Sequence, residues 1–506
     1  MRIVWQKVRP IVSKPLFFSG FTATVLLVLG VWFWLADISY EHPGPALAVG
    51  LLGVAVFFIG LALNDLQSDK GPIPLSRDDS VSSHLPRVVG LAHLVDRWQL
   101  FNPSEEDRKI LDEQVQLILS TAQRHYNTYD EIRLLKYFRG AKLKGGAFLL
   151  TISPNITPLV WKFDSLTNIN REIRNYQHCV REFLGNTPGE AWEPRQRYGT
   201  MGTEDWGVIA YNFVGRGTDP VALKQLQTFS DYYLSHGEPQ IAGIIQQIFS
   251  VLEPWWLMRR GWPEDCRRGG LRSLYDEYNR LSRYRSVMKQ ELQAVGRQQQ
   301  VATLENLDFS TTYLDLDLGK PLRNPFNWLL EVFEAKKLDV WSVQHRQDSI
   351  VHGDFHAGNI LIEDGDAPKI RLIDFPHVHV GPTVQDIARL EADLKFGLLA
   401  DESLQRLGLE GLRASETALL PLNPVDSEPP PAILTTEQER KTWCIVQLLR
   451  REAQRYNIIG SDARPYYLAL LHATLPILYY RDRSPWQKLY AFVSASLLCE
   501  QLEARM

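Results

Sequence analysis

The sequence predicts an α+β fold, with a small antiparallel β lobe followed by a larger helical lobe and preceded by two transmembrane helices. Three observations lead to this prediction. Two long uncharged runs open the chain, β-like runs surround a glycine-rich turn, and a group of polar residues at 352–375 is framed by short apolar runs. We divide the chain into four parts: 1–66, a transmembrane hairpin; 67–129, a polar linker and helical support; 130–215, the β lobe; and 216–506, the helical lobe.

The composition bounds the possible functions. The 506 residues are 45% hydrophobic and include 14 Trp, enough for a large core. A formal net charge of −4 argues against a nucleic-acid partner, because the composition has no excess of basic residues that would produce a basic surface. The four cysteines are far apart and predict reduced, buried thiols, not a disulfide framework or a zinc site: Cys179, Cys266, Cys444 and Cys499.

The two N-terminal runs have the length of membrane spans. Residues 16–36 and 46–63 carry no charge and, as helices, extend over roughly 31 and 27 Å, close to the thickness of a bilayer core. Basic residues flank their outer ends and the connection 37–45 is acidic, so the positive-inside rule places both termini and the main domain in the cytoplasm. We therefore expect a multi-pass membrane protein in contact with the lipid bilayer. The alternative is a hydrophobic hairpin buried inside a soluble domain.

The next segment is typical of a tether. Residues 64–88 are polar and turn-rich. Ser104 and the acidic residues after it then favour a helix that runs to about His125 and supports the next domain.

The stretch 352–375 carries the residues that phosphoryl transfer requires. Asp354 and Asn359 lie five positions apart, and Asp374 follows twenty positions after Asp354. In this chemistry one carboxylate takes the proton of an incoming hydroxyl, while an amide and a second carboxylate hold the magnesium that neutralises the phosphates. Apolar runs on both sides of the turn 363–366 predict a β-hairpin that brings the metal ligands Asn359 and Asp374 side by side.

This pattern resembles the catalytic segment of the aminoglycoside phosphotransferase and choline kinase-like family, relatives of the protein kinases. In that family His-Gly-Asp, four residues and Asn precede Ile-Asp-Phe, as they do here from His352 to Phe375. Gly381-Pro382 and the later Asp386-Ile387-Ala388 are also similar, and the resemblance implies that His352 and Asp386 brace the catalytic loop. It covers about residues 130–400 and implies a two-lobed protein kinase-like fold.

Such a fold needs a nucleotide-binding lobe upstream of the catalytic loop. A glycine-rich turn ending at Gly145 and Gly146 lies between β-like runs at 134–138 and 148–152, where backbone N–H groups can approach phosphates. Lys162, on the short strand that comes next, resembles the lysine that contacts the α- and β-phosphates in the family.

The lysine is expected to have a carboxylate partner on the next helix. We place that helix from Thr167 or Asn168 to about Leu184, and we favour Glu172 as the partner over Glu182, which lies well around the helix.

Residues 206–215 are predicted to form a buried strand that ends in a break. In the family this strand leads to the hinge that binds the adenine edge, so the resemblance implies nucleotide contacts at Tyr211 and Phe213.

Two other patterns carry less weight. His377 and His379 alternate as on a strand, but a zinc site needs further ligands and Asp374 is already assigned to magnesium. Trp255-Trp256, with arginines nearby, is interpreted as the core of a helical insertion at 216–345 rather than as a nucleic-acid stacking surface.

The predicted function is a membrane-anchored phosphotransferase that uses ATP and Mg²⁺ to transfer the γ-phosphate to a hydroxyl or amine of a small molecule. Asp354 is the predicted base, Asn359 and Asp374 are the metal ligands, and Lys162 contacts the phosphates. Two alternatives stay open: a catalytically silent nucleotide-binding module, and a membrane scaffold that recruits a protein partner. The sequence does not identify the acceptor.

Overall fold

The structure is a computed structural model. It describes residues 86–91, 105–126, 128–139, 146–152, 158–181, 198–201, 204–213, 226–257, 274–334, 348–365, 368–422, 429–480 and 482–505. Internal contacts divide the chain into residues 1–83 and 84–506, and the described ranges all belong to the second unit.

The localisation expected from the sequence is corrected by the structure. No helix within the described ranges is both long and apolar enough to cross a membrane. The apolar surface of those helices is used in packing; α19 (Pro485–Glu503), for example, is enclosed by its own lobe. The two predicted spans, 16–36 and 46–63, lie outside the described residues. The expected multi-pass localisation therefore has no support in the described part of the chain.

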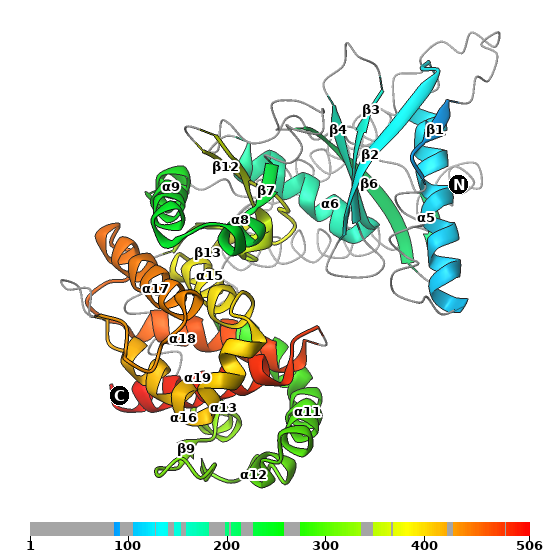
Figure 1. The fold of residues 1–506 in the computed structure, drawn as a ribbon. Helices are drawn as coiled ribbons and strands as arrows, with labels where there is room; N and C mark the ends of the chain where they lie inside the picture. Colours follow the sequence, from blue (N-terminus) through cyan, green and yellow to red (C-terminus); the bar gives the residue numbers. More distant parts are fainter. Residues whose placement is uncertain are drawn as a thin grey trace, which may run out of the picture. The chain divides into compact units, whose positions relative to one another are not determined.

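The β lobe is built on one six-stranded sheet (Figure 1). Its spatial order is β1-β2-β3-β4-β6-β5, and neighbouring strands are antiparallel except for the parallel pair β1-β2. The strands are β1 (Arg87–Val89), β2 (Glu131–Arg139), β3 (Gly146–Thr151), β4 (Leu159–Ser165), β5 (Tyr198–Met201) and β6 (Glu204–Asn212).

Alternation along β4 sorts its side chains onto the two faces of the sheet. Trp161 and Phe163 are buried in a cluster with Ile118 of α5 (Glu105–His125), the helix that covers one face. Lys162, between them, reaches the opposite face, where α6 (Leu166–Asn175) packs on β6. Because Trp161 and Phe163 are buried on one face of the sheet, Lys162 between them must lie on the other face.

The helical lobe follows the sheet and contains most of the remaining elements (Figure 1). Its described helices are α8 (Phe229–Ser235), α9 (Glu238–Leu257), α11 (Leu274–Gln299), α12 (Ala302–Glu305), α13 (Pro325–Glu334), α15 (Val384–Phe396), α16 (Asp401–Leu419), α17 (Glu437–Arg455), α18 (Arg464–Thr474) and α19. Its short strands are β7 (Leu226–Thr228), β8 (Tyr313–Leu314), β9 (Leu322–Arg323), β10 (Asp348–Val351), β11 (Ile360–Glu363), β12 (Lys369–Leu372) and β13 (His379–Pro382).

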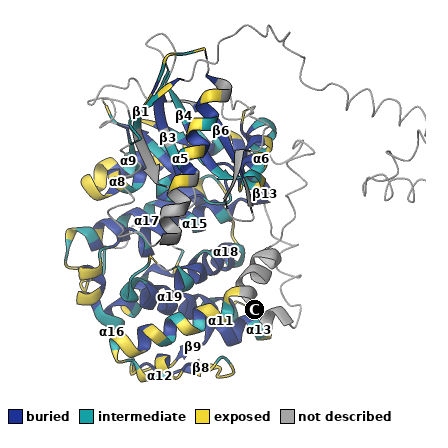
Figure 2. Cartoon of the chain, turned by 90° about the vertical axis from the view of Figure 1, so that its right-hand side faces the viewer, coloured by how far each residue is buried: buried dark blue, intermediate teal, exposed yellow. Residues whose placement is uncertain are grey.

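The core of this lobe forms around α19, which is buried along nearly its whole length and is drawn in dark blue in Figure 2. A helix with apolar residues on most of its faces is stable only when other elements surround it. Helices α16, α18 and α11 contact it.

A buried ionic network joins the helices around α15. The guanidinium of Arg450 donates to both carboxylate oxygens of Glu391, at 2.7 and 2.6 Å, and the hydroxyl of Tyr466 also donates to Glu391. Lys395 donates to Glu416 at 2.5 Å. Burial raises the pKa of Glu391, but Arg450 and Lys395 outweigh burial and hold that pKa below its ordinary value. Each buried charge thus has a partner that offsets its desolvation.

The structure contains the hairpin that the sequence predicts, since β11 and β12 pair antiparallel with Ile362 opposite Ile370. It differs at the helix after the lysine. Ser165, rather than Thr167 or Asn168, caps α6 by accepting the backbone N–H of Asn168. The helix then continues as a π-helical turn, Tyr176–Val180.

The thiol prediction was wrong at one position. Cys179 is disulfide-bonded, whereas Cys444 and Cys499 are free; Cys499 is buried and Cys444 is half-buried. Cys266 lies outside the described residues. Sequence spacing carried no signal, because a disulfide depends on which cysteines the fold brings together.

Replacing Arg450 by methionine leaves the carboxylate of Glu391 buried without its main partner. We expect the free energy of unfolding to fall by about 3–5 kcal/mol, as when one member of a buried ion pair is removed. The matched control is Arg455→Met in the same helix, because Arg455 is 72% exposed and surface pairs contribute only about 0–1 kcal/mol. Equilibrium urea unfolding measures both, and equal losses would contradict the assignment.

Candidate active site

The catalytic loop is held by one side chain of α15. Both oxygens of the fully buried Asp386 accept backbone N–H groups, one from His352 at 2.8 Å and the other from Gly353 at 3.0 Å. Burial raises the pKa of Asp386 to about 7, although the two N–H groups oppose that rise by stabilising the carboxylate. Asp386 is therefore hydrogen-bonded to the loop that the resemblance implied it braces, and the bracing role itself stays a prediction.

The same face of α15 carries two further contacts to the loop. Arg389 donates to Asp354, and Asp393 accepts the backbone N–H of Ala357 at 2.9 Å. Positions 386, 389 and 393 recur at helical spacing, so they form one stripe along the helix. Only the first of the three was predicted, although their spacing in the sequence already indicated a shared face.

Gly353 is required by the geometry of the loop. Its φ is +76°, and a Cβ there would lie 2.3 Å from the carbonyl oxygen of His377. An L-residue at this position would combine an unfavourable backbone conformation with a direct clash.

His352 joins the loop to the strand that leads to Asp374. Its Nε2 lies 3.0 Å from the carbonyl oxygen of Ile373, so this nitrogen is the donor. Burial lowers the pKa of His352 to about 4, which keeps the ring neutral. The ring also contacts Phe355 and Phe375. His352 thus contacts both the strand and the loop, and its role in bracing the loop stays a prediction.

Asp354 lies between two basic side chains. Arg389 Nε is 3.2 Å from Oδ1, and His356 Nε2 is 3.7 Å from Oδ2. The other nitrogen of His356, Nδ1, accepts the backbone N–H of Gly358, so Nε2 carries the ring proton. Burial raises the pKa of Asp354, but Arg389 and the nearby histidines outweigh burial and hold it at about 2. The carboxylate is therefore ionised at neutral pH.

Asn359 fixes the distance between the two halves of the motif. Its side-chain Nδ2 donates to the carbonyl of Asp354 at 2.9 Å, and its own carbonyl accepts the N–H of Ile373 at 3.1 Å. Because the amide nitrogen is used in this way, the amide oxygen Oδ1 is left for another partner; it has no hydrogen bond to a described residue.

Asp374 lies in a conformation that few L-residues adopt. Its φ is +72°, which is uncommon outside glycine and clusters at functional sites. The turn is secured by Asn175 at the end of α6, whose amide donates to the carbonyls of Phe375 and Pro376 at 3.2 and 3.0 Å. No sequence pattern indicates Asn175, because the contact joins residues 200 positions apart.

Lys162 links the sheet to that turn. Its Nζ lies 2.6 Å from Oδ1 of Asp374 and 2.5 Å from Oε2 of Glu172. Burial lowers the pKa of Lys162, but the two carboxylates outweigh burial and raise it above its ordinary value. The other oxygen of Glu172 accepts the hydroxyl of Tyr211 at 2.5 Å. The predicted partner Glu172 is thus beside the lysine, while Glu182 lies outside the described residues.

The remaining predicted nucleotide contacts lie at the end of β6 and the start of β3. The hydroxyl of Tyr211 bonds Glu172 instead of facing outward, and the N–H of Phe213 donates to Pro158 at 2.7 Å. Gly146 is buried in β3, opposite Phe163. Gly145 lies outside the described residues.

A small apolar cluster joins the sheet to the catalytic hairpin. Leu149, Phe213 and Leu226 are buried together, and the half-buried Val160 and Leu361 pack against them. Val160 lies two residues before Lys162, on the same strand, and Leu361 lies two after Asn359. Neither was selected from the sequence, because isolated aliphatic residues resemble any other core position.

The described residues fit magnesium better than zinc. No group of three or more His, Cys, Asp or Glu side chains in those ranges is placed to hold a metal. Mg²⁺, however, is usually bound by one or two side-chain oxygens together with substrate phosphates and water. The carboxylate of Asp374 and the amide oxygen of Asn359 are donors of that kind.

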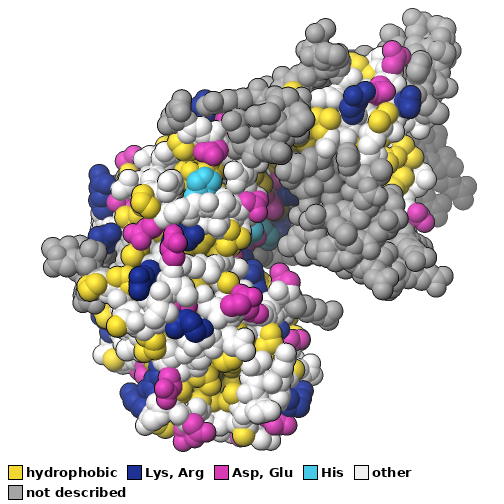
Figure 3. Space-filling view, viewed as in Figure 1, with side chains coloured by type: hydrophobic (Ala, Val, Ile, Leu, Met, Phe, Trp, Pro, Cys, Tyr) yellow, Lys and Arg dark blue, Asp and Glu magenta, His cyan; other side chains and the backbone are white. Residues whose placement is uncertain are grey.

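Two surface features lie apart from this site. On the face in Figure 3, acidic and basic side chains are interspersed over the helical lobe.

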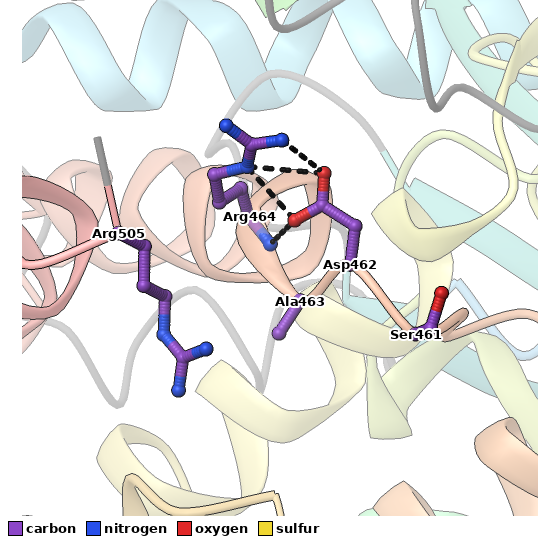
Figure 4. Close-up of a pocket in the computed structure, with 5 residues that line it drawn as sticks. All are labelled: Ser461, Asp462, Ala463, Arg464 and Arg505. Atoms are coloured by element: carbon purple, nitrogen blue, oxygen red, sulfur yellow. Dashed lines mark hydrogen bonds and ion pairs between the residues drawn. The ribbon is translucent and has the colours of Figure 1, made fainter.

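A pocket before α18 is lined by Ser461, Asp462, Ala463, Arg464 and Arg505 (Figure 4). Within it Arg464 is paired with Asp462 at 2.7 Å. None of its lining residues belongs to the motif 352–375.

Asp386→Ala removes the acceptor of two buried N–H groups. We expect the free energy of unfolding to fall by about 2–6 kcal/mol, since each unsatisfied buried donor costs about 1–3 kcal/mol. Asp386→Asn keeps one acceptor oxygen and should lose less. Urea unfolding gives the global effect, and hydrogen exchange at the amides of His352 and Gly353 gives the local one. Unchanged protection of these amides in the alanine variant would show that the brace is assigned wrongly.

Comparison with known proteins identifies one family model that matches part of the chain. The model "Ternary complex associated domain 9" matches residues 279–479. No curated protein matches the sequence.

Among solved structures, an ethanolamine kinase of Plasmodium vivax is 12% identical, covering 80% of this chain and 91% of its own, with a TM-score of 0.39. A choline kinase of Streptococcus pneumoniae is 11% identical, covering 77% and 99%, with a TM-score of 0.39. An aminoglycoside phosphotransferase is 13% identical, covering 76% and 97%, also at 0.39. The structural neighbours are thus small-molecule kinases and phosphotransferases, but at these TM-scores the likeness carries no argument of its own.

Proposed function

We propose that the chain is an ATP- and magnesium-dependent phosphotransferase that transfers the γ-phosphate to a hydroxyl or amine of a small molecule. One observation carries the proposal. Lys162 from the sheet meets Asp374 from the catalytic hairpin at 2.6 Å, so a phosphate-binding cation and a metal-binding carboxylate converge beside the loop that carries Asp354.

The nucleotide is assigned to the place where the sheet meets the hairpin. The apolar side chains around Val160 and Leu361 can pack against the faces of the adenine ring of ATP, and the ammonium of Lys162 can bind the phosphates of ATP. Glu172 is buried and bonded to Tyr211, so it holds the ammonium of Lys162 in place when Asp374 turns to a metal.

Mg²⁺ held by Asn359 and Asp374 would neutralise charge on the phosphates. Asn359 keeps its amide oxygen available for this role by donating its nitrogen to the loop.

Asp354 is assigned to the acceptor. A carboxylate with a pKa of about 2 is a weak base, so its main task is to accept a hydrogen bond from the hydroxyl and orient its oxygen for in-line attack. Orientation suffices because phosphoryl transfer has a loose transition state in which the proton leaves late.

Asp354→Asn keeps the shape of this side chain and removes its charge. We expect magnesium-dependent ATP turnover to fall by about 10²–10⁴-fold, because the amide orients the hydroxyl less strongly and cannot take its proton, with little change in ATP affinity. Coupled detection of ADP on the full chain measures turnover, with water as acceptor until a better one is found. Asp364→Asn, in the exposed turn of the same hairpin, is the control. A wild type without magnesium-dependent turnover would favour the silent nucleotide-binding alternative.

Asp374→Asn tests the metal ligand separately. With magnesium present, ATP should bind about tenfold to 100-fold more weakly, the equivalent of one charge-assisted contact. Without magnesium its affinity should change little, because Lys162 keeps its bond to Glu172. Calorimetric titration of ATP with and without magnesium gives both values. Equal weakening in the two conditions would remove Asp374 from the metal site.

A further inference from the structure

The acceptor side of the site is basic. Arg389 Nε lies 3.2 Å from Oδ1 of Asp354, and the neutral ring of His356 has its protonated Nε2 3.7 Å from Oδ2. Farther along the same stripe of α15, Arg483 lies 3.7 Å from Asp393 and is paired with that carboxylate. The guanidinium of Arg389 attracts an anionic group more than a cationic one.

Arg389 has more donors than its contact with Asp354 uses. The guanidinium carries five N–H groups, and only Nε is bonded to a described residue. Its side chain is 18% exposed, and among the described residues its Nη atoms are not fully buried atoms that lack a hydrogen-bond partner. They form a planar fork of the kind that binds a carboxylate or phosphate through two parallel hydrogen bonds.

The carboxylates on the same helix do not occupy this fork. Arg389 lies between Asp386 and Asp393 on α15, and both of these side chains accept backbone N–H groups of the loop. Asp393 stabilises the charge of Arg389 from a distance but forms no ion pair with it. Among the described carboxylates, Asp354 alone lies within ion-pair distance of the guanidinium. The fork therefore stands next to the oxygen that orients the acceptor hydroxyl.

We propose that the acceptor is a hydroxyl compound that carries an anionic group, a carboxylate or a phosphate ester, and that Arg389 binds this group through its Nη atoms beside Asp354. The inference rests on the proposed phosphotransferase function and adds the chemical class of its second substrate. Arg389 then has two tasks: it positions Asp354 through Nε and selects the acceptor through the Nη atoms.

The test measures affinity, so that it does not depend on turnover. The full chain is loaded with Mg²⁺ and a non-hydrolysable ATP analogue, which fills the nucleotide's phosphate site. Glycerol, D-glycerate, glycerol 3-phosphate and choline are then titrated by calorimetry. We expect either anionic probe to bind at least about tenfold more tightly than glycerol, the worth of one charged contact, and choline to bind no better than glycerol.

Variants of Arg389 show whether this residue is the source of the preference. Arg389→Gln should reduce the ratio of anionic to neutral affinity to about one, and Arg389→Lys should restore part of it, since lysine keeps the charge but not the fork. Arg455→Gln, on the exposed surface of α17, should keep the full ratio. Thermal unfolding confirms that each variant is folded.

The outcomes separate the two proposals. A wild type that binds anionic probes no better than glycerol overturns the inference, as does an Arg389→Gln protein that keeps the preference; the second result would assign Arg389 to positioning alone. Magnesium-dependent ATP turnover is measured independently on the same protein. If turnover is absent while the preference depends on Arg389, the phosphotransferase function fails and the anion site stands.

Discussion

The carboxylate of Asp386 is the contact on which the catalytic loop depends. It accepts the N–H groups of His352 and Gly353, which places Asp354 at the start of the loop. From the same helix, Asp393 holds the end of the loop at Ala357. A loop carries function well when a rigid element positions it. Here α15 does so through polar bonds that satisfy backbone donors inside the protein, where an unpaired donor would be costly.

The second constraint joins the sheet to this loop through buried charge. Glu172 is 1% exposed, so its negative charge is tolerable only because Lys162 and the hydroxyl of Tyr211 both bond to it. Lys162 in turn reaches Asp374, whose backbone conformation is unusual. Asn175 adds an uncharged tie between α6 and the same turn. A shift of α6 would therefore disturb the lysine and the turn together.

The features that could be predicted from the sequence are local. Asp354, Asn359 and Asp374 sit on one loop and one hairpin, so their spacing along the chain already encodes their proximity, and the strand that carries Lys162 follows from the alternation of Trp161 and Phe163. The features that were missed are long-range. The roles of Tyr211, Asn175 and Leu361, and the disulfide at Cys179, arise from packing between distant segments. Arg389 lies between these two cases. The helical spacing of residues 386, 389 and 393 indicates a shared face, but nothing in the sequence indicates that the guanidinium of Arg389 contacts Asp354. The membrane topology rested on hydropathy and on the charges that flank the two apolar runs, and the described helices do not support it.

The charge around Asp354 explains how a weak base can serve in such a site. Arg389 and His356 stabilise the carboxylate and lower its affinity for a proton, which is unfavourable for a general base that must act early. In a loose phosphoryl transfer, however, correct orientation of the acceptor hydroxyl matters more than its early deprotonation. The contacts that lower the pKa of Asp354 also fix the direction of its oxygens. Arg389 leaves positive charge on the acceptor side, close to where the transferred group would gain negative charge, so one side chain contributes both to orientation of the acceptor and to stabilisation of charge.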